Sequence, residues 1–534
     1  MRIVTFIVLL AASAFTALAQ QTSQPDPVAI KPGQALADDT TNQSADGGPS
    51  TATLVGTLGV TISCDLENHR SSTEYSLQTD DETIHPLRFS TPRRLTSGAR
   101  VSVTGIQAPE GFQVDTLTEL EKVHARGAPQ ENIGDQSTIL LLVNSFENPV
   151  QPITPTEAYD RVFSLSRTDS IHSWIKQVSY ERTSLSGDVS GWHTLSLTRV
   201  QLCHGQNAFW NQAIFNELDS FVNFSLYERV VMVIPFDSGC QWSGIGSVGK
   251  EQYTNDGGVL LSVQRLNGAG ELNDGTGVHE LGHNFGAYHA NAWDCGANIL
   301  EGSCNSLEYF DPFDVLGASF PKGYFNAVHR EKIGWFEANE ILQLTNESGA
   351  YVLGPLETPN VLKAIKIPSN GFMFYVEYRR AIGYDNNYVY NNLGWGMLGT
   401  DVYRGAIIHT DQFFGTGDSQ LLDMLPHLLL PTNSVANQLD IVESMLEVGT
   451  TFSYNGVNLT PTRLNDASLN VCVEFGDHLD ADSDGVPDAC DVCPGFNDAE
   501  PCPIPAISAW GMVAMAALML AAGAVVVSRR RAAG

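Results

Sequence analysis

One short segment in the middle of the chain combines three histidines and a glutamate at fixed spacing. On a helix, His279 and His283 stand four residues apart and therefore share one face, with Glu280 on the adjacent side. Gly286 can end this helix in a left-handed turn, which redirects the chain so that His289 joins the two histidines. The spacing therefore predicts a site in which three imidazoles bind Zn²⁺ and leave one position for water.

The same residues suggest a chemistry. Zinc lowers the pKa of a bound water to about 7, and Glu280 can take its proton as the water attacks a peptide carbonyl. Glu280 can then pass the proton to the leaving amine. A short HExxH string also occurs by chance in unrelated helices. The additional Gly286 and His289 argue against chance, so we expect a hydrolytic site with Glu280 as the catalytic residue.

The pattern HExxHxxGxxH resembles that of the metzincin metallopeptidases, and within them the gametolysin family and its bacterial relatives. Three further strings support the likeness, namely SGDVSGW at 186–192, FNAVHREKIGW at 325–335 and FYVEYR at 374–379. The likeness covers roughly residues 137–476. It implies an α+β fold class, with a metzincin domain of twisted mixed sheet and an active-site helix, flanked by all-β domains.

The resemblance also implies roles for single residues. It assigns zinc ligation to His279, His283 and His289, and catalysis to Glu280. Metzincins place a methionine in a tight turn beneath the metal, whereas Leu316 stands at the matching position here. Leucine has a similar volume and apolar character, so we expect this replacement to cost little.

The charge balance excludes some partners. The 534 residues include 29 Lys and Arg against 60 Asp and Glu, a formal net charge of −31. A nucleic-acid-binding protein needs clustered basic residues on its surface, so we expect no nucleic-acid partner. Apolar residues make up 43% of the chain, which is enough for packed cores.

An acidic string near the C-terminus predicts a calcium site. Its carboxylates stand at positions 1, 3, 5, 9 and 12 of an EF-hand-like loop, with Gly485 at position 6. With Cys490 and Cys493 the string resembles a thrombospondin type 3 repeat, which implies a Ca²⁺-stiffened stalk. A simple acidic linker is the alternative. The expected ligands are Asp480, Asp482, Asp484, Asp488 and Asp491.

Both ends of the chain have the character of targeting segments. Residues 1–19 combine a basic start, an apolar run and a small-residue end, which predicts a cleaved secretory signal peptide. Residues 506–527 carry no charge and precede three arginines at 529–531, which predicts a membrane span with the body of the protein outside. The string IPAISAWG at 504–511 resembles the start of IPTL-CTERM sorting signals. A plain membrane anchor is the alternative.

Together these patterns predict how the chain is organised. We expect a signal peptide (1–19), a flexible linker (20–53), a small β domain or propeptide (54–130), the metzincin catalytic domain (137–338), a β-sandwich-like domain (339–476), a calcium-binding stalk (477–502) and a C-terminal sorting signal with a membrane span (504–531).

Nine cysteines in an exported chain suggest disulfides, with one cysteine left over. Cys295 and Cys304 lie close enough in sequence to staple the loop after the last histidine, and Cys203 with Cys240 is a second candidate pair. Cys64 is the expected odd residue. It could cap the zinc as in metzincin cysteine switches, but its surroundings do not match that motif, so we expect ordinary burial.

We therefore expect an exported zinc endopeptidase at the outer surface of a bacterium or outside the cell. Its substrates would be extracellular proteins or peptides, and its partners the membrane, through the C-terminal segment, and the envelope sorting machinery. The alternatives are a non-catalytic surface adhesin built on a metzincin scaffold and a zinc hydrolase that acts on a non-peptide bond.

Overall fold

The computed structural model describes residues 51–121, 129–204, 208–273, 275–302, 304–317, 322–385, 404–411, 418–426, 444–483 and 486–491. The expected signal peptide, the membrane span at 506–527 and Asp484 lie outside these residues. Among the helices that the structure describes, none combines the length and apolar character needed to cross a membrane.

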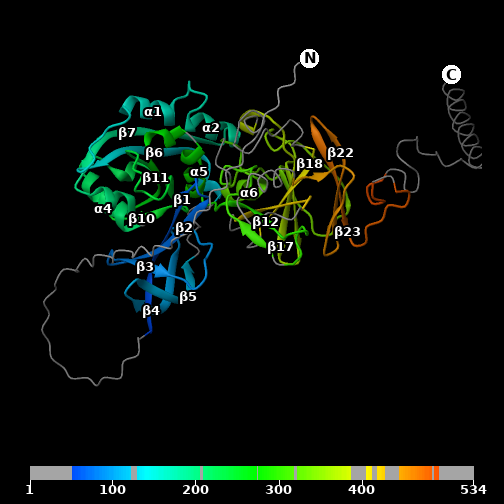
Figure 1. Cartoon of the computed structure of the whole chain (residues 1–534), viewed down its shortest axis with the longest axis horizontal. Helices are drawn as coiled ribbons and strands as arrows, with labels where there is room; N and C mark the ends of the chain where they lie inside the picture. Colours follow the sequence, from blue (N-terminus) through cyan, green and yellow to red (C-terminus); the bar gives the residue numbers. More distant parts are fainter. Residues whose placement is uncertain are drawn as a thin grey trace, which may run out of the picture. The chain divides into compact units, whose positions relative to one another are not determined.

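The first described strands close into a five-stranded barrel (Figure 1, blue). Strand β1 pairs with β4 along its first half and with β2 along its second half, so the same strand joins both edges. A Cβ at Gly56 would lie 2.3 Å from the Gln78 carbonyl oxygen, so glycine is needed where β1 passes from one partner to the other. The strands are β1 (Thr51–Asp65), β2 (Arg70–Thr79), β3 (Ile84–Arg88), β4 (Arg100–Ala108) and β5 (Gly111–Glu121).

Beyond the barrel, β1 continues into a second set of strands in the order β1-β9-β11-β8-β6-β7. Strands β11, β8, β6 and β7 are parallel, whereas β9 is antiparallel to both of its neighbours. All six residues of β8 are buried, as expected for a parallel strand covered on both faces. The strands are β6 (Gly134–Ser145), β7 (Thr183–Leu195), β8 (Arg229–Ile234), β9 (Gly244–Ser247), β10 (Glu251–Tyr253) and β11 (Val259–Asn267).

Helices cover both faces of this central sheet. One apolar core joins alternate residues of β6 to α1, α2 and α5, and the second joins the other residues of β6 to α3 and α4. The first helix begins where the Thr154 side chain accepts a hydrogen bond from the Glu157 amide, with proline at the first position. The helices are α1 (Pro155–Phe163), α2 (Ile171–Val178), α3 (Arg199–His204), α4 (Ala208–Leu218), α5 (Gly275–Asn284), α6 (Ala327–Ile333), and the 3-10 helices η1 (Pro129–Asn132), η2 (Phe224–Leu226), η3 (Asn255–Gly257), η4 (Ala269–Asn273) and η5 (Gly383–Asp385).

The C-terminal half of the chain is built from two further sheets around one apolar core. The larger has the order β13-β12-β19-β18-β17-β16-β14, with β20 beside β18, and the smaller has the order β15-β23-β22-β21. Two strands of the larger sheet, β12 and β13, come from the segment directly after His289, before the expected boundary at residue 339. The strands are β12 (Ala290–Asp294), β13 (Asn305–Leu307), β14 (Ile341–Gln343), β15 (Gly349–Leu353), β16 (Ala364–Ser369), β17 (Phe372–Glu377), β18 (Gly405–Asp411), β19 (Ser419–Leu422), β20 (Leu446–Glu447), β21 (Phe452–Tyr454), β22 (Val457–Asn465) and β23 (Ser468–Phe475).

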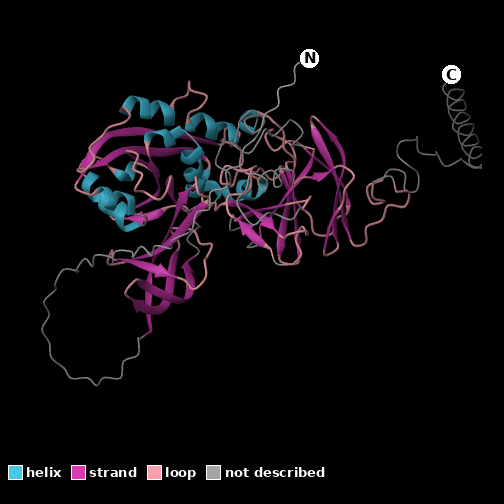
Figure 2. Ribbon diagram, viewed as in Figure 1, coloured by secondary structure: helices cyan, strands magenta, loops and turns pink. Residues whose placement is uncertain are grey.

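The expected α+β metzincin fold class is wrong. Strands make up 42% and helices 17% of the structure, with a five-stranded barrel and several sheets (Figure 2). The six α-helices of the described residues are between 6 and 11 residues long. They cover faces of the sheets, and their share of the fold is much smaller than that of the strands. The helical periodicity around the histidines was real, but it applied to one ten-residue helix.

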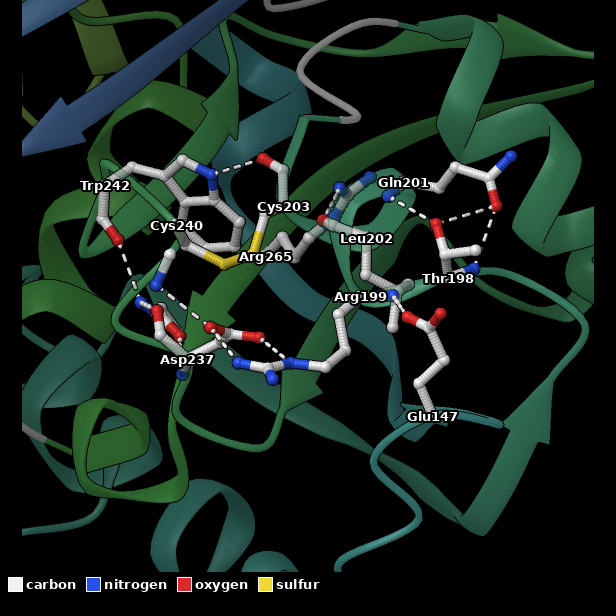
Figure 3. Close-up of a disulfide and its surroundings, with 12 residues drawn as sticks. Glu147, Thr198, Arg199, Gln201, Leu202, Cys203, Asp237, Cys240, Trp242 and Arg265 are labelled. Carbon is white, nitrogen blue, oxygen red and sulfur yellow. Dashed lines mark hydrogen bonds and ion pairs between the residues drawn. A yellow bond between two sulfur atoms is a disulfide. The ribbon is translucent and has the colours of Figure 1, made fainter.

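Three disulfides are present in the described residues, and they include both expected pairs. Cys203 in α3 bonds Cys240, and Cys295 bonds Cys304. The third joins Cys472 of β23 to Cys490. Figure 3 shows the first of these, where the Trp242 indole donates a 2.7 Å hydrogen bond to the Cys203 carbonyl oxygen.

Candidate metal centre

Helix α5 places two of the predicted ligands, and the turn after it places the third. All residues of α5 are buried, and the rings of His279 and His283 lie 5.0 Å apart. The Gly286 amide donates to the His283 carbonyl, and the φ of +95° at Gly286 lies in the left-handed region that favours glycine. This turn brings the His289 ring within 4.8 Å of that of His283. The expected left-handed turn at Gly286 is therefore confirmed.

Each of the three imidazoles is oriented by a hydrogen bond from its Nδ1 atom. His279 donates to the Val315 carbonyl at 3.0 Å and His283 to the Ala287 carbonyl at 2.9 Å. His289 donates to the Glu308 carboxylate at 2.9 Å. Acceptors of this kind select the tautomer in which Nε2 keeps its lone pair, which is the arrangement of metal-bound histidines.

The three Nε2 atoms converge with a fourth atom that we did not expect there. The Cys64 thiol of β1 lies 3.5 Å from Nε2 of His283 and 3.5 Å from Nε2 of His289. The ligand atoms of these residues and His279 all lie within 4.8 Å of one another. Our expectation of ordinary burial for Cys64 was therefore incomplete, because this thiol is buried at the centre of the site.

The geometry fits a cation. Nε2 of His283 and Nε2 of His289 are only 3.1 Å apart. Because both rings donate through Nδ1, two lone pairs face each other at this distance, an arrangement that a shared positive ion stabilises. Burial lowers the pKa of His279 and of His283 well below the usual value, so both rings are neutral as ligands must be. The four residues form a group that can hold a metal ion.

Glu280 lies beside this group, next to the strand that borders the site. It is fully buried, and a Cβ at Gly244 of β9 would lie 2.4 Å from its Oε1 atom. Glycine in β9 therefore makes the space for the carboxylate. Neither oxygen has a hydrogen-bond partner of good geometry among the described residues. Burial raises the pKa of Glu280 well above its ordinary value; the facing Cys64 thiol lowers it, and Glu271 raises it further.

Strand β1 of the barrel covers the site. Its residues Thr61–Cys64 pair antiparallel with Ser247–Gly244 of β9, the strand that borders Glu280. The Ser243 amide donates to the Cys64 carbonyl at 2.7 Å, and the Ser97 amide after β3 donates to the Val248 carbonyl at 2.8 Å. The barrel core also includes Val248, Tyr288 and Tyr309. The barrel is therefore packed against the site and not merely tethered to it.

A cavity of about 620 Å³ lies beside β1 on the side of Ser63 and Asp65. Its other wall comes from the segment between β8 and β9, including Phe236 and Trp242, and from Glu271 of η4. The disulfide in Figure 3 holds this wall to α3. A cavity of this size accommodates several side chains of an extended peptide.

The turn that carries Leu316 lies under α5. A Cβ at Gly282 would lie 2.9 Å from a methyl group of Leu316, so the two are in close contact. The Leu316 amide donates to Asp314 at 2.6 Å, and Asp314 also accepts from His329 at 2.8 Å. Leucine therefore supplies apolar contact beneath the helix, as expected from its volume.

Two residues at the site were missed by the sequence reasoning. Glu308 accepts from Ser71 of the barrel at 2.5 Å as well as from His289. The Tyr309 ring centroid lies 4.2 Å from that of His289. Both follow the loop closed by a disulfide, and no spacing rule marks them as neighbours of the histidines. Burial, followed by the nearby Cys64 and Glu308, raises the pKa of Tyr309 well above its ordinary value.

The calcium-binding prediction remains a prediction. Asp484 lies outside the described residues, and the described part of the chain contains no carboxylate cluster with metal-binding spacing. One loop contact is present, since the Ala481 amide donates to Asp488 at 2.8 Å. The remaining expected ligands are Asp480, Asp482 and Asp491.

Neither a scan against models of protein families nor a search of curated proteins finds a match.

Proposed function

We propose that the protein is an exported zinc-dependent endopeptidase that hydrolyses peptide bonds in extracellular proteins. The observation that carries the proposal is the convergence of three Nε2 lone pairs beside the buried Glu280 carboxylate, which has no hydrogen-bond partner of good geometry among the described residues. A ligand set of nitrogen and sulfur atoms favours zinc over calcium or magnesium. The resemblance of the histidine segment to that of gametolysin-family peptidases supports the same activity.

The chain's own residues support the steps of peptide hydrolysis. Zinc, when bound, would polarise the scissile carbonyl and acidify the attacking water. Glu280, as the carboxylate beside the metal position, accepts the proton of that water and returns it to the leaving nitrogen. The space that Gly244 and Gly246 leave is filled by this carboxylate.

We propose further that the barrel is an inhibitory propeptide. Cys64 would be the fourth ligand of a bound metal, and β1 forms hydrogen bonds with β9 where an extended substrate would have to lie. The ligands His279 and His283 and the base Glu280 are fully buried in this arrangement. Activity therefore requires that β1 leaves β9, and a cut between the end of β5 at Glu121 and the start of η1 at Pro129 would separate the barrel from the rest of the chain.

One observation favours a different function. The four residues would together close the coordination sphere of a bound metal, as is typical of structural zinc sites. On that basis the protein would be a non-catalytic surface adhesin whose metal holds the barrel in place. The two functions diverge once β1 is released, because only the endopeptidase would then become active.

The test uses the full chain with a site-specific protease sequence placed in residues 122–128 and with Cys64→Ala. After cleavage and zinc loading, we expect digestion of casein or gelatin that a chelator stops. Glu280→Gln should abolish digestion without loss of zinc, and Glu347→Gln, at an exposed loop carboxylate, should have no effect. Digestion that survives Glu280→Gln would disprove the proposed mechanism. Zinc binding without any peptide cleavage would favour the adhesin or a hydrolase of another bond.

Signal-peptide export, the membrane span and envelope sorting are parts of the same proposal. The three disulfides among the described residues are consistent with an oxidising location outside the cytoplasm. Intact-mass measurement of the protein isolated from its native host would determine whether residues 1–19 and the tail from 504 have been removed.

A further inference from the structure

Tyr309 is held against the metal ligands by both its ring and its backbone. Its ring centroid lies 4.2 Å from that of His289 and 5.7 Å from that of His279. Its amide donates to the Asn291 side chain at 3.1 Å, and its φ of +65° is in the left-handed region, which is unusual for an aromatic residue. Backbone conformations of this kind persist where the surrounding structure enforces them, and they concentrate at functional sites.

The Tyr309 hydroxyl points at the position that Cys64 occupies. Burial raises the pKa of the Cys64 thiol most, and a side-chain hydrogen bond from Tyr309 acts in the opposite direction. The other contact of the Tyr309 hydroxyl is a long one of 3.4 Å to the Arg70 carbonyl oxygen of β2. Both partners belong to the barrel, so the hydroxyl would lose them when β1 leaves β9.

We propose that Tyr309 is a catalytic residue, whose hydroxyl stabilises the oxyanion that forms during hydrolysis. This inference rests on the proposed endopeptidase function. With a metal bound, the Cys64 sulfur would be the fourth ligand, in the place that an oxygen atom of the reacting group would take. A donor that reaches the sulfur in the full chain can reach that oxygen once the barrel is displaced.

The step can be written with its atoms and electrons balanced. Water gives one proton to Glu280, and its oxygen bonds to the carbonyl carbon while the π electron pair of the carbonyl moves to oxygen. That oxyanion accepts a hydrogen bond from Tyr309, which keeps its proton. When the electron pair on the oxyanion forms the carbonyl double bond again, the carbon–nitrogen bond breaks, and the nitrogen takes the proton from Glu280. The products are a carboxylic acid, which ionises, and an amine.

A hydrogen bond of this kind stabilises the transition state more than it stabilises bound substrate. Its loss should therefore lower kcat and leave KM nearly unchanged. In the cleaved chain with Cys64→Ala, Tyr309→Phe should lower kcat about 100-fold and change KM by less than about threefold. Zinc content should not change. Tyr324→Phe is the matched control, because it removes another buried hydroxyl, one that accepts a hydrogen bond from Gln177. We expect this control to retain its kcat.

A kcat of Tyr309→Phe within twofold of its parent would overturn the assignment. Loss of zinc from Tyr309→Phe, but not from Tyr324→Phe, would also overturn it, because the tyrosine would then support the site and not the reaction. A second measurement needs no turnover. In the full chain loaded with Co²⁺, Tyr309→Phe should shift the thiolate-to-cobalt absorption band, and Tyr324→Phe should not.

The two measurements separate this inference from the proposed function. If the parent enzyme cleaves no peptide, the endopeptidase function fails, while a shifted cobalt band still places the hydroxyl at the fourth position. If the parent cleaves peptides and the cobalt band does not move in Tyr309→Phe, the assignment of Tyr309 is wrong and the endopeptidase function stands.

Discussion

Replacing Glu251 with glutamine should remove a pH dependence from the docking of β1. Glu251 is buried in β10, and its carboxyl accepts from the Thr61 hydroxyl of β1 at 2.9 Å and from the Tyr253 hydroxyl at 2.7 Å. Burial raises the pKa of Glu251 to about 7, and the donors Tyr253 and Thr61 offset this effect only in part. Burial raises the pKa of Tyr253 well above its ordinary value, and the nearby Arg265 guanidinium lowers it in part.

Whether docking of β1 becomes stronger or weaker with rising pH depends on whether the docked or the open form keeps Glu251 protonated. The docked form keeps Glu251 protonated up to about pH 7, whereas an exposed glutamate ionises near its ordinary pKa of 4.5. The contribution of Glu251 to docking is therefore complete below about pH 4.5, declines as the pH rises, and is lost above about pH 7. The difference of roughly 2.5 pH units corresponds to about 3 kcal/mol, so β1 should open on the order of 100-fold more readily at pH 8 than at pH 5.

Hydrogen exchange of the β1 amides measures this opening directly. Protection should be compared between the wild type and Glu251→Gln at pH 5, 6, 7 and 8, after correction for intrinsic exchange at each pH. Protection should fall with pH in the wild type and stay nearly constant in Glu251→Gln. Glu110→Gln, in the exposed turn between β4 and β5, should behave like the wild type. An equal loss of protection in the wild type and Glu251→Gln would refute the reasoning.

Three further predictions concern the site and its wall. Cys64→Ala should weaken zinc binding by the full chain about 100-fold in competition with a chelator, and an unchanged affinity would exclude the thiol as a ligand. Gly244→Ala would place a Cβ 2.4 Å from the Glu280 carboxylate, so the cleaved enzyme should lose at least about 100-fold in kcat while it keeps its zinc. Replacing both cysteines of the disulfide in Figure 3, which are 37 residues apart, should lower the free energy of unfolding by about 4 kcal/mol in denaturant titrations; a loss below about 1 kcal/mol would contradict this.

The parts of the site that could be predicted are those determined by local geometry. His279 and His283 share a face because of helical periodicity, and Gly286 turns the chain because a left-handed residue ends a helix. The pair Cys295 and Cys304 is only nine residues apart, so its disulfide was also within reach of sequence reasoning. None of these inferences needs knowledge of which strands pair.

The parts that could not be predicted depend on long-range pairing. Cys64 reaches the site only because β1 pairs with β9. Tyr309 reaches it through the fold of the chain after β13, in a sheet whose strands β12 and β19 come from distant segments. The fold class was wrong for the same reason, since one strong helical segment says little about how many strands surround it.

Strand β1 has a consequence for how the chain folds. In a protein made from its N-terminus, the barrel strands exist before β9 is synthesised, and β1 then offers β9 a finished edge on which to add. A chain that began after residue 121 would leave the β9 edge without this partner, and unpaired edges of this kind promote aggregation. We therefore expect the barrel to act as a template for folding, so that attempts to produce the remaining body without it should yield far less soluble material.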